Sequence, residues 1–123
     1  MEYKRLEFED AILLVMDVQA LDETNPISPP LVQLIRVCNA MEVPELWVEH
    51  CPGKIGGTSI VAVKNALIQA RAVGPIAKTT FSAVDNTVFC MELLKIACKK
   101  KSLSLKLTFY TFHNVLFSLI AVK

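Results

Sequence analysis

The sequence predicts a single α/β domain in which short parallel strands alternate with helices. The first supporting observation is AILLVM at 11–16, an apolar run without alternation that is typical of a strand covered on both faces. The second is the order of the expected elements, strand, helix, strand, helix, helix, which favours right-handed crossovers. The third is size: 123 residues, 53% of them hydrophobic, suffice for one buried core.

The first helix is predicted over residues 30–42. Ser28 is a suitable N-cap and Pro29 fits the first helical position. Apolar residues then recur at helical spacing until Pro44 ends the pattern. This apolar stripe consists of Leu31, Leu34, Ile35, Cys38 and Met41.

Residues 45–50, ELWVEH, are the second predicted strand, and a turn-rich loop, CPGKIGGT, follows it. Ser59 is placed to cap a second helix over about 60–73. Gly74 is the expected C-terminal stop of that helix, with Pro75 directly after it.

The next segment, PIAKTTFSAV, is predicted to be extended, and a third helix follows over 86–97. Either Asp85 or Asn86 caps this helix. Its apolar stripe consists of Phe89, Leu93 and Ile96.

An acidic residue, Asp17, ends the first strand, and Gln19 follows two places later. In open parallel sheets, ligands bind beyond the carboxyl ends of the strands. His50 and Cys51 lie at the same point of the second strand. Asp17 either serves such a site, where its proton affinity can be tuned, or caps the following loop through backbone amides. The residues alone leave both interpretations open.

Charge and cysteine content exclude several classes of function. A formal net charge of +1 indicates neither a nucleic acid nor an acidic partner. The start, MEYKRLEFED, lacks the apolar core of a signal peptide, so we expect a cytoplasmic protein with free thiols. The four cysteines form no C-x-x-C pair and no zinc pattern with either histidine. Neither a metal nor a cofactor is therefore expected.

Three stretches, in order, resemble the isochorismatase-like family of cysteine hydrolases: AILLVMDVQ, ELWVEHCPGKIGGT and PIAKTTFSA. The similarity covers about residues 9–97. It implies a three-layer, Rossmann-like α/β domain with a parallel sheet and helices on both faces. It also implies a hydrolase that acts on a small-molecule substrate, either an amide or a vinyl ether.

The resemblance also implies catalytic roles. Asp17 matches the family's acid and Lys78 its lysine: the carboxylate takes the proton of a nucleophilic thiol, and the ammonium steadies the developing charge. Phe81 would line the substrate pocket, and Gln19 would orient the loop after the first strand. Without the resemblance, Lys78 is better explained as a solvated lysine and Phe81 as a core residue.

The C-terminal part departs from the family. The nucleophilic cysteine is expected near Thr111, but residues 99–123 contain neither cysteine nor glycine. The net charge changes sign close to this point. Residues 1–92 carry a net charge of −5, and the remaining residues carry a net charge of +6 without any acid. We interpret residues 1–98 as the N-terminal part of a hydrolase domain, with an incomplete sheet. Residues 99–123 are then a divergent tail, lost from the family pattern by truncation or a frame change.

Three cysteines within residues 1–92 are candidate substitutes for the missing nucleophile. Cys51 is the best placed, at the end of the second strand, whereas Cys38 and Cys90 fall within predicted helices as core residues. Family members that cleave a vinyl ether can work without the cysteine, with the Asp as acid. We nevertheless expect an inactive chain, and the alternative is a non-catalytic binding or membrane-tethered remnant.

The tail contains 16 uncharged residues, 107–122, between Lys106 and Lys123. An interior strand followed by a covering helix is the preferred interpretation. Membrane contact is disfavoured because a spanning helix needs about 20 apolar residues, and His113 and Asn114 are costly in a bilayer. The third interpretation is an aggregation-prone end, and an exposed strand edge would favour a homo-oligomer.

Overall fold

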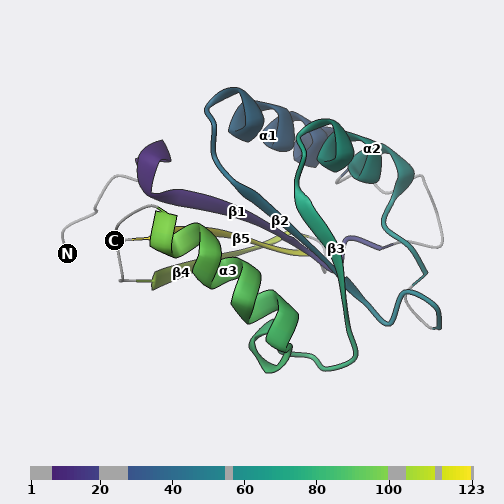
Figure 1. Ribbon diagram of the computed structural model, residues 1–123. Helices are drawn as coiled ribbons and strands as arrows, with labels where there is room; N and C mark the ends of the chain where they lie inside the picture. Colours follow the sequence, from purple (N-terminus) through teal and green to yellow (C-terminus); the bar gives the residue numbers. More distant parts are fainter. Residues whose placement is uncertain (1–6, 20–27, 55–56, 100–104, 113–114, 123) are drawn as a thin grey trace.

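The computed structural model describes residues 7–19, 28–54, 57–99, 105–112 and 115–122 (Figure 1). Side chains are described as far as residue 99, and only the backbone is described in the two C-terminal strands.

The centre of the fold is a five-stranded sheet with the order β3-β2-β1-β5-β4. The first three strands are parallel to one another, and β5 pairs antiparallel with both β1 and β4. The strands are β1 (Ala11–Met16), β2 (Glu45–His50), β3 (Val73–Lys78), β4 (Leu105–Phe112) and β5 (Val115–Val122).

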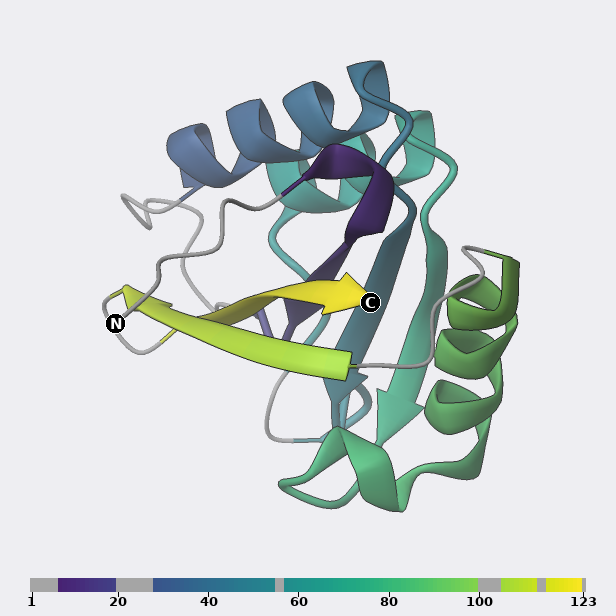
Figure 2. The same ribbon diagram turned by 90° about the vertical axis from the view of Figure 1, so that its left-hand side faces the viewer.

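Helices cover both faces of the sheet, with α1 and α2 on one side and α3 on the other (Figures 1 and 2). Two short 3-10 turns precede β1 and α3. The helices are α1 (Ser28–Ala40), α2 (Val61–Gln69) and α3 (Thr87–Lys99), and the turns are η1 (Phe8–Asp10) and η2 (Ala83–Asp85).

A hydrophobic core lies on each face of the sheet, and these two cores explain the unbroken apolar run of β1. Alternate side chains of a strand point to opposite faces. One set of three packs beneath α1 and α2, and the other set packs against α3. The first set is Ala11, Leu13 and Val15, and the second is Ile12, Leu14 and Met16. The prediction of an α/β fold with β1 as a central strand beside β2 is therefore confirmed.

The expectation for the tail was partly wrong. Its second half is the strand β5 rather than a covering helix, and the sheet is mixed rather than wholly parallel. Only two residues separate β4 from β5, a spacing that favours an antiparallel hairpin. The hairpin also gives β1 a hydrogen-bonding neighbour on the side away from β2. Among the described residues, no helix has the length and apolar character to cross a membrane.

Two helix ends differ from the sequence prediction. α2 ends four residues early, because Arg71 adopts a left-handed φ of 57°. Its N–H donates to Ile68 O, and the Ala72 N–H donates to Leu67 O, which together form a Schellman motif. Gly74, the expected stop, instead lies within β3. α1 ends in the same way at Glu42, also with φ 57°, which leaves Met41 outside the helix and exposed.

Of the predicted helix caps, Asn86 is confirmed, because its Oδ1 accepts a 3.0 Å hydrogen bond from the Phe89 N–H. Ser59 is not a cap: its hydroxyl donates to Glu49 Oε1 instead, at 2.8 Å. Ser28 lies inside α1, and its Oγ has no hydrogen-bond partner among the described residues. The expected cap at Ser28 is therefore not seen.

Candidate functional site

The carboxyl ends of β1, β2 and β3 meet at one edge of the sheet. Asp17 follows β1, and its N–H donates to Val48 O at 3.0 Å. His50 ends β2 and pairs in register with Lys78, the last residue of β3. Paired residues on neighbouring strands place their side chains on the same face. Three polar side chains from three strands therefore converge.

Asp17 and Lys78 form an ion pair across 61 positions of sequence. The distance from Lys78 Nζ to Asp17 Oδ2 is 2.9 Å, and the side chains are 1% and 38% exposed, respectively. The resemblance implies that these two residues share one site, and they do lie together in the structure. Lys78 is not the solvated lysine of the alternative interpretation. Whether the pair is catalytic stays a prediction.

The Lys78 ammonium has three further acceptors. They are the carbonyl oxygens of Thr80 and Phe81, at 3.1 Å and 3.3 Å, and the Nδ1 atom of His50, at 3.3 Å. The lysine thus links the end of β3 to the segment that follows it. A buried ammonium requires such partners, because its desolvation is otherwise costly.

Two residues of this edge have left-handed backbone conformations. Asp17 has φ 57° and Cys51 has φ 42°, each directly after a strand. Such angles are uncommon outside glycine and often occur at functional sites. The second oxygen of Asp17, Oδ1, is buried and has no hydrogen-bond partner among the described residues. The edge therefore combines backbone strain with an unsatisfied carboxylate atom.

Gln19 joins three segments at this edge. Its Oε1 accepts from the His50 N–H at 2.6 Å, and its Nε2 donates to His50 O at 3.0 Å and to Gly57 O at 2.6 Å. Its backbone also forms a β-bridge with Ser59. These contacts hold Gln19 against the end of β2, and its role in orienting the loop after β1 stays a prediction.

The Phe81 side chain lies at the surface. It is 98% exposed, so it is not the core residue of the alternative interpretation. It does not line an enclosed pocket in the part of the chain that the structure describes. Its ring stacks on His50, with centroids 5.8 Å apart and planes 20° apart. An exposed ring beside polar groups offers an apolar surface to a ligand.

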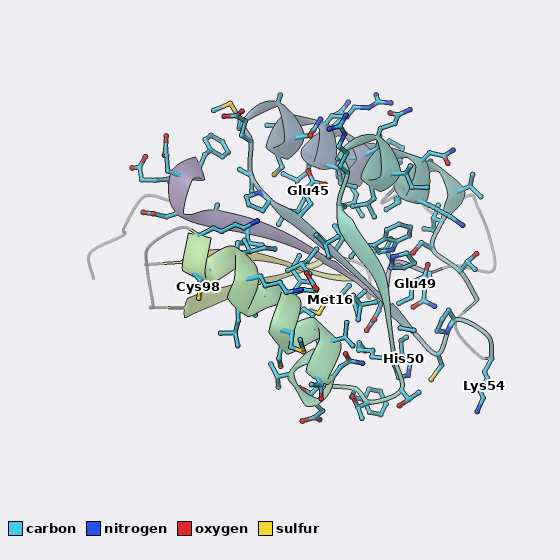
Figure 3. The ribbon with its side chains drawn as sticks, in the orientation of Figure 1. Met16, Glu45, Glu49, His50, Lys54 and Cys98 are labelled. Carbon is cyan, nitrogen blue, oxygen red and sulfur yellow. The ribbon has the colours of Figure 1, made fainter. Side chains whose placement is uncertain are left out.

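His50 is the site residue that sequence reasoning missed. The sequence places it at the carboxyl end of the second strand but gives it no role. The structure instead gives it contacts with Lys78, Phe81 and Gln19. Its position as the last residue of a parallel strand was the available signal. Figure 3 shows His50 and Glu45 at opposite ends of β2.

A buried hydrogen-bond network next to the candidate site was also not predicted from the sequence. Glu49 Oε1 accepts hydrogen bonds from the Ser59 N–H and hydroxyl, at 2.9 Å and 2.8 Å. Trp47 Nε1 donates to Ser59 Oγ at 2.8 Å. This network ties Ser59, just before α2, to β2. Among the described residues, no cluster of three or more histidine, cysteine or acidic side chains could hold a metal ion.

The position at which the resemblance places the nucleophile lies away from the Asp17–Lys78 ion pair. Thr111 is in β4, which runs in the same direction as β1 because both are antiparallel to β5. The end of β4 thus faces the same edge as Asp17, but one strand lies between β4 and β1. Two strand spacings correspond to about 10 Å. A nucleophile must come within hydrogen-bond reach of its base, about 3 Å.

Comparison with known proteins adds no relative. No family model matches the chain, and no curated protein and no solved structure matches it. The resemblance to isochorismatase-like hydrolases therefore rests on the three sequence stretches and stays a prediction.

Proposed function

We propose that this chain is an isochorismatase-like hydrolase scaffold that binds a small amide or vinyl-ether metabolite at the carboxyl edge of β1, β2 and β3. The observation that carries the proposal is the 2.9 Å contact between Lys78 Nζ and Asp17 Oδ2. Two charged residues far apart in sequence meet where parallel sheets bind ligands. The exposed Phe81 ring supplies an apolar surface beside them.

The proposed scaffold does not carry out thioester chemistry. An acyl-enzyme needs a thiolate within reach of its base, and no cysteine occupies the family position. Cys51 is half-buried at the end of β2, so it is the substitute that an experiment must exclude. The separation of β4 from β1 supports a binding role over a catalytic one.

The test assays the full chain against simple amides and vinyl ethers, alongside Asp17→Asn and Cys51→Ser. We expect no turnover in any of the three, because losing the nucleophile of such a unit costs on the order of 10⁴–10⁶ in rate. Turnover abolished by Cys51→Ser would relocate the nucleophile and overturn the inactive assignment. Turnover lost only in Asp17→Asn would show an enzyme that uses the acid alone.

Binding is measured separately, by ligand-observed NMR with the same amides and vinyl ethers. Asp17→Asn should weaken binding, because it removes the charge of a site residue. Asp85→Asn is the matched control, since Asp85 is an exposed acid in η2. Equal binding by the wild-type chain and Asp17→Asn, or none by either, would contradict the proposed site.

A further inference from the structure

The Lys78 ammonium has no proton left for a ligand. Four acceptors lie within 3.3 Å of Nζ: Asp17 Oδ2, His50 Nδ1, and the carbonyl oxygens of Thr80 and Phe81. An ammonium has only three protons to donate. The side chain is also 1% exposed. Lys78 is therefore a centre of internal hydrogen bonding rather than a group that meets a ligand.

The contact between Lys78 Nζ and His50 Nδ1 determines which ring nitrogen of His50 carries the proton. An ammonium donates hydrogen bonds and never accepts them, so Nδ1 must present its lone pair to Lys78. In the neutral imidazole the ring proton is then on Nε2. No described residue pairs with Nε2. The ring thus carries a donor without a partner in the described part of the site.

Two further contacts reach His50, one at its backbone and one at its ring. The Gln19 side chain binds the His50 backbone twice: it accepts from the His50 N–H at 2.6 Å and donates to the His50 carbonyl oxygen at 3.0 Å. Phe81 stacks on the imidazole face. A donor held in this way binds a ligand without the entropic cost of ordering a free side chain.

We propose that His50 is the ligand-contacting donor of this site, and that its Nε2–H binds a carbonyl or carboxylate oxygen of a planar ligand. Lys78 is a positioning residue that acts through His50. Phe81 supplies the face on which the planar part of the ligand packs. The inference rests on the proposed function for the location of the site, but not on turnover. It differs from the family resemblance, in which the lysine meets the reacting group.

Two substitutions separate the two nitrogen atoms of His50. His50→Asn keeps a polar acceptor near the position of Nδ1, so it can still accept from Lys78, but it lacks a donor at Nε2. His50→Gln reaches the position of Nε2 with an amide N–H and leaves Nδ1 unreplaced. A ligand-contacting His50 predicts that His50→Asn weakens binding more than His50→Gln does. A purely structural His50 predicts the reverse order.

The probes are benzamide and benzoate, with toluene as a planar probe that lacks an acceptor. The full chain is titrated while the NMR signal of the His50 Nε2–H group is followed. The chain has two histidines, so the signal that disappears in His50→Asn is assigned to His50. Benzamide or benzoate should shift this signal and toluene should not. The Kd should rise about three- to tenfold in His50→Asn, the loss of one hydrogen bond.

Each outcome decides the inference. Unchanged affinity in His50→Asn, binding that leaves the Nε2–H signal unmoved, or no binding of either acceptor probe would overturn it. Binding that depends on Asp17 but not on His50 would overturn the inference and leave the proposed function standing. Binding that depends on His50 but not on Asp17 would overturn the proposed function alone.

Discussion

At the level of single residues, two buried ionisable groups have opposite environments. Lys78 at the end of β3 has four hydrogen-bonding partners, including a carboxylate. Glu45 at the start of β2 is buried beneath the helices, and neither of its carboxyl oxygens has a partner among the described residues. A buried ammonium with partners and a buried carboxyl group without them respond differently to substitution and to pH.

Replacing Lys78 should destabilise the fold far more than replacing a surface lysine. Lys78→Met leaves Asp17 and two carbonyl oxygens without their donor. We expect a loss of about 2–3 kcal/mol, below the range for fully buried pairs because Asp17 is partly exposed. Lys95→Met is the control: the Lys95 side chain is 59% exposed, so the loss of its ion pair with Glu92 should cost less than about 1 kcal/mol. Equal losses in urea unfolding would contradict this difference.

Glu45 should make stability fall as pH rises. Burial raises the pKa of Glu45 from 4.5 to about 8. Between these values the unfolded chain has released the proton while the folded chain keeps it, so the free energy of unfolding decreases as pH rises. The slope is at most about 1.4 kcal/mol per pH unit, and it flattens above the folded pKa.

Glu45→Gln should remove this part of the pH dependence, because the amide does not titrate. Urea unfolding of both chains between about pH 5 and pH 9 measures the difference, across the window set by the two pKa values. Burial, followed by the nearby Glu45 charge, raises the pKa of Cys38 to about 11, so this thiol stays protonated throughout. An identical slope in wild type and variant would show that Glu45 is not the titrating group.

At the scale of elements, the pairing of β3 with β2 depends on one glycine. Gly74 has φ +142°, and a Cβ atom there would collide with the carbonyl oxygen of Trp47. The register of the two strands shifts at this point, between Leu46 and Val48. Because β3 carries Lys78, an error in this pairing would also displace the site.

Gly74→Ala should therefore cost at least about 2 kcal/mol through backbone strain and the clash. Gly53→Ala is a matched control, because a Cβ there has no neighbour within 4 Å. We expect the control to change the free energy of unfolding by less than about 0.5 kcal/mol. A melting experiment in which the two variants behave alike would refute a structural need for glycine at position 74.

At the scale of the whole molecule, the C-terminal hairpin completes the sheet around β1. β5 pairs with β1 along Ala11 to Val15, the strand at the centre of both cores. Without β5, the N–H and C=O groups along that side of β1 would have no partner in the sheet. The two strands of the C-terminal tail, β4 and β5, therefore belong to the same sheet as the candidate site.

A chain that ends after Lys99 should be less stable and should self-associate. Its exposed β1 edge is a template for pairing with a second copy. Light scattering and urea unfolding of residues 1–99, compared with the full chain, measure both effects. A monomeric fragment with unchanged stability would show that the hairpin contributes little to the sheet.

Much of the framework follows from local patterns in the sequence. The unbroken run in β1 predicted a strand covered on both faces, since only a buried strand carries apolar side chains at consecutive positions. The Asn86 cap was predicted from the residues alone, whereas the meeting of Asp17 with Lys78 was predicted from the α/β fold and the family resemblance together. These features depend on side-chain periodicity and chain direction, which a sequence displays.

Other features depend on neighbours that only the tertiary structure brings together. The residue pattern was sufficient to predict the α/β class and the central position of β1. The tertiary structure decided that the tail forms a hairpin beside β1, that Gly74 faces the Trp47 backbone, and that His50 accepts from Lys78. The physical reason is that strand pairing and hydrogen-bond partners are long-range contacts, selected by what lies across the sheet rather than by residues adjacent in sequence.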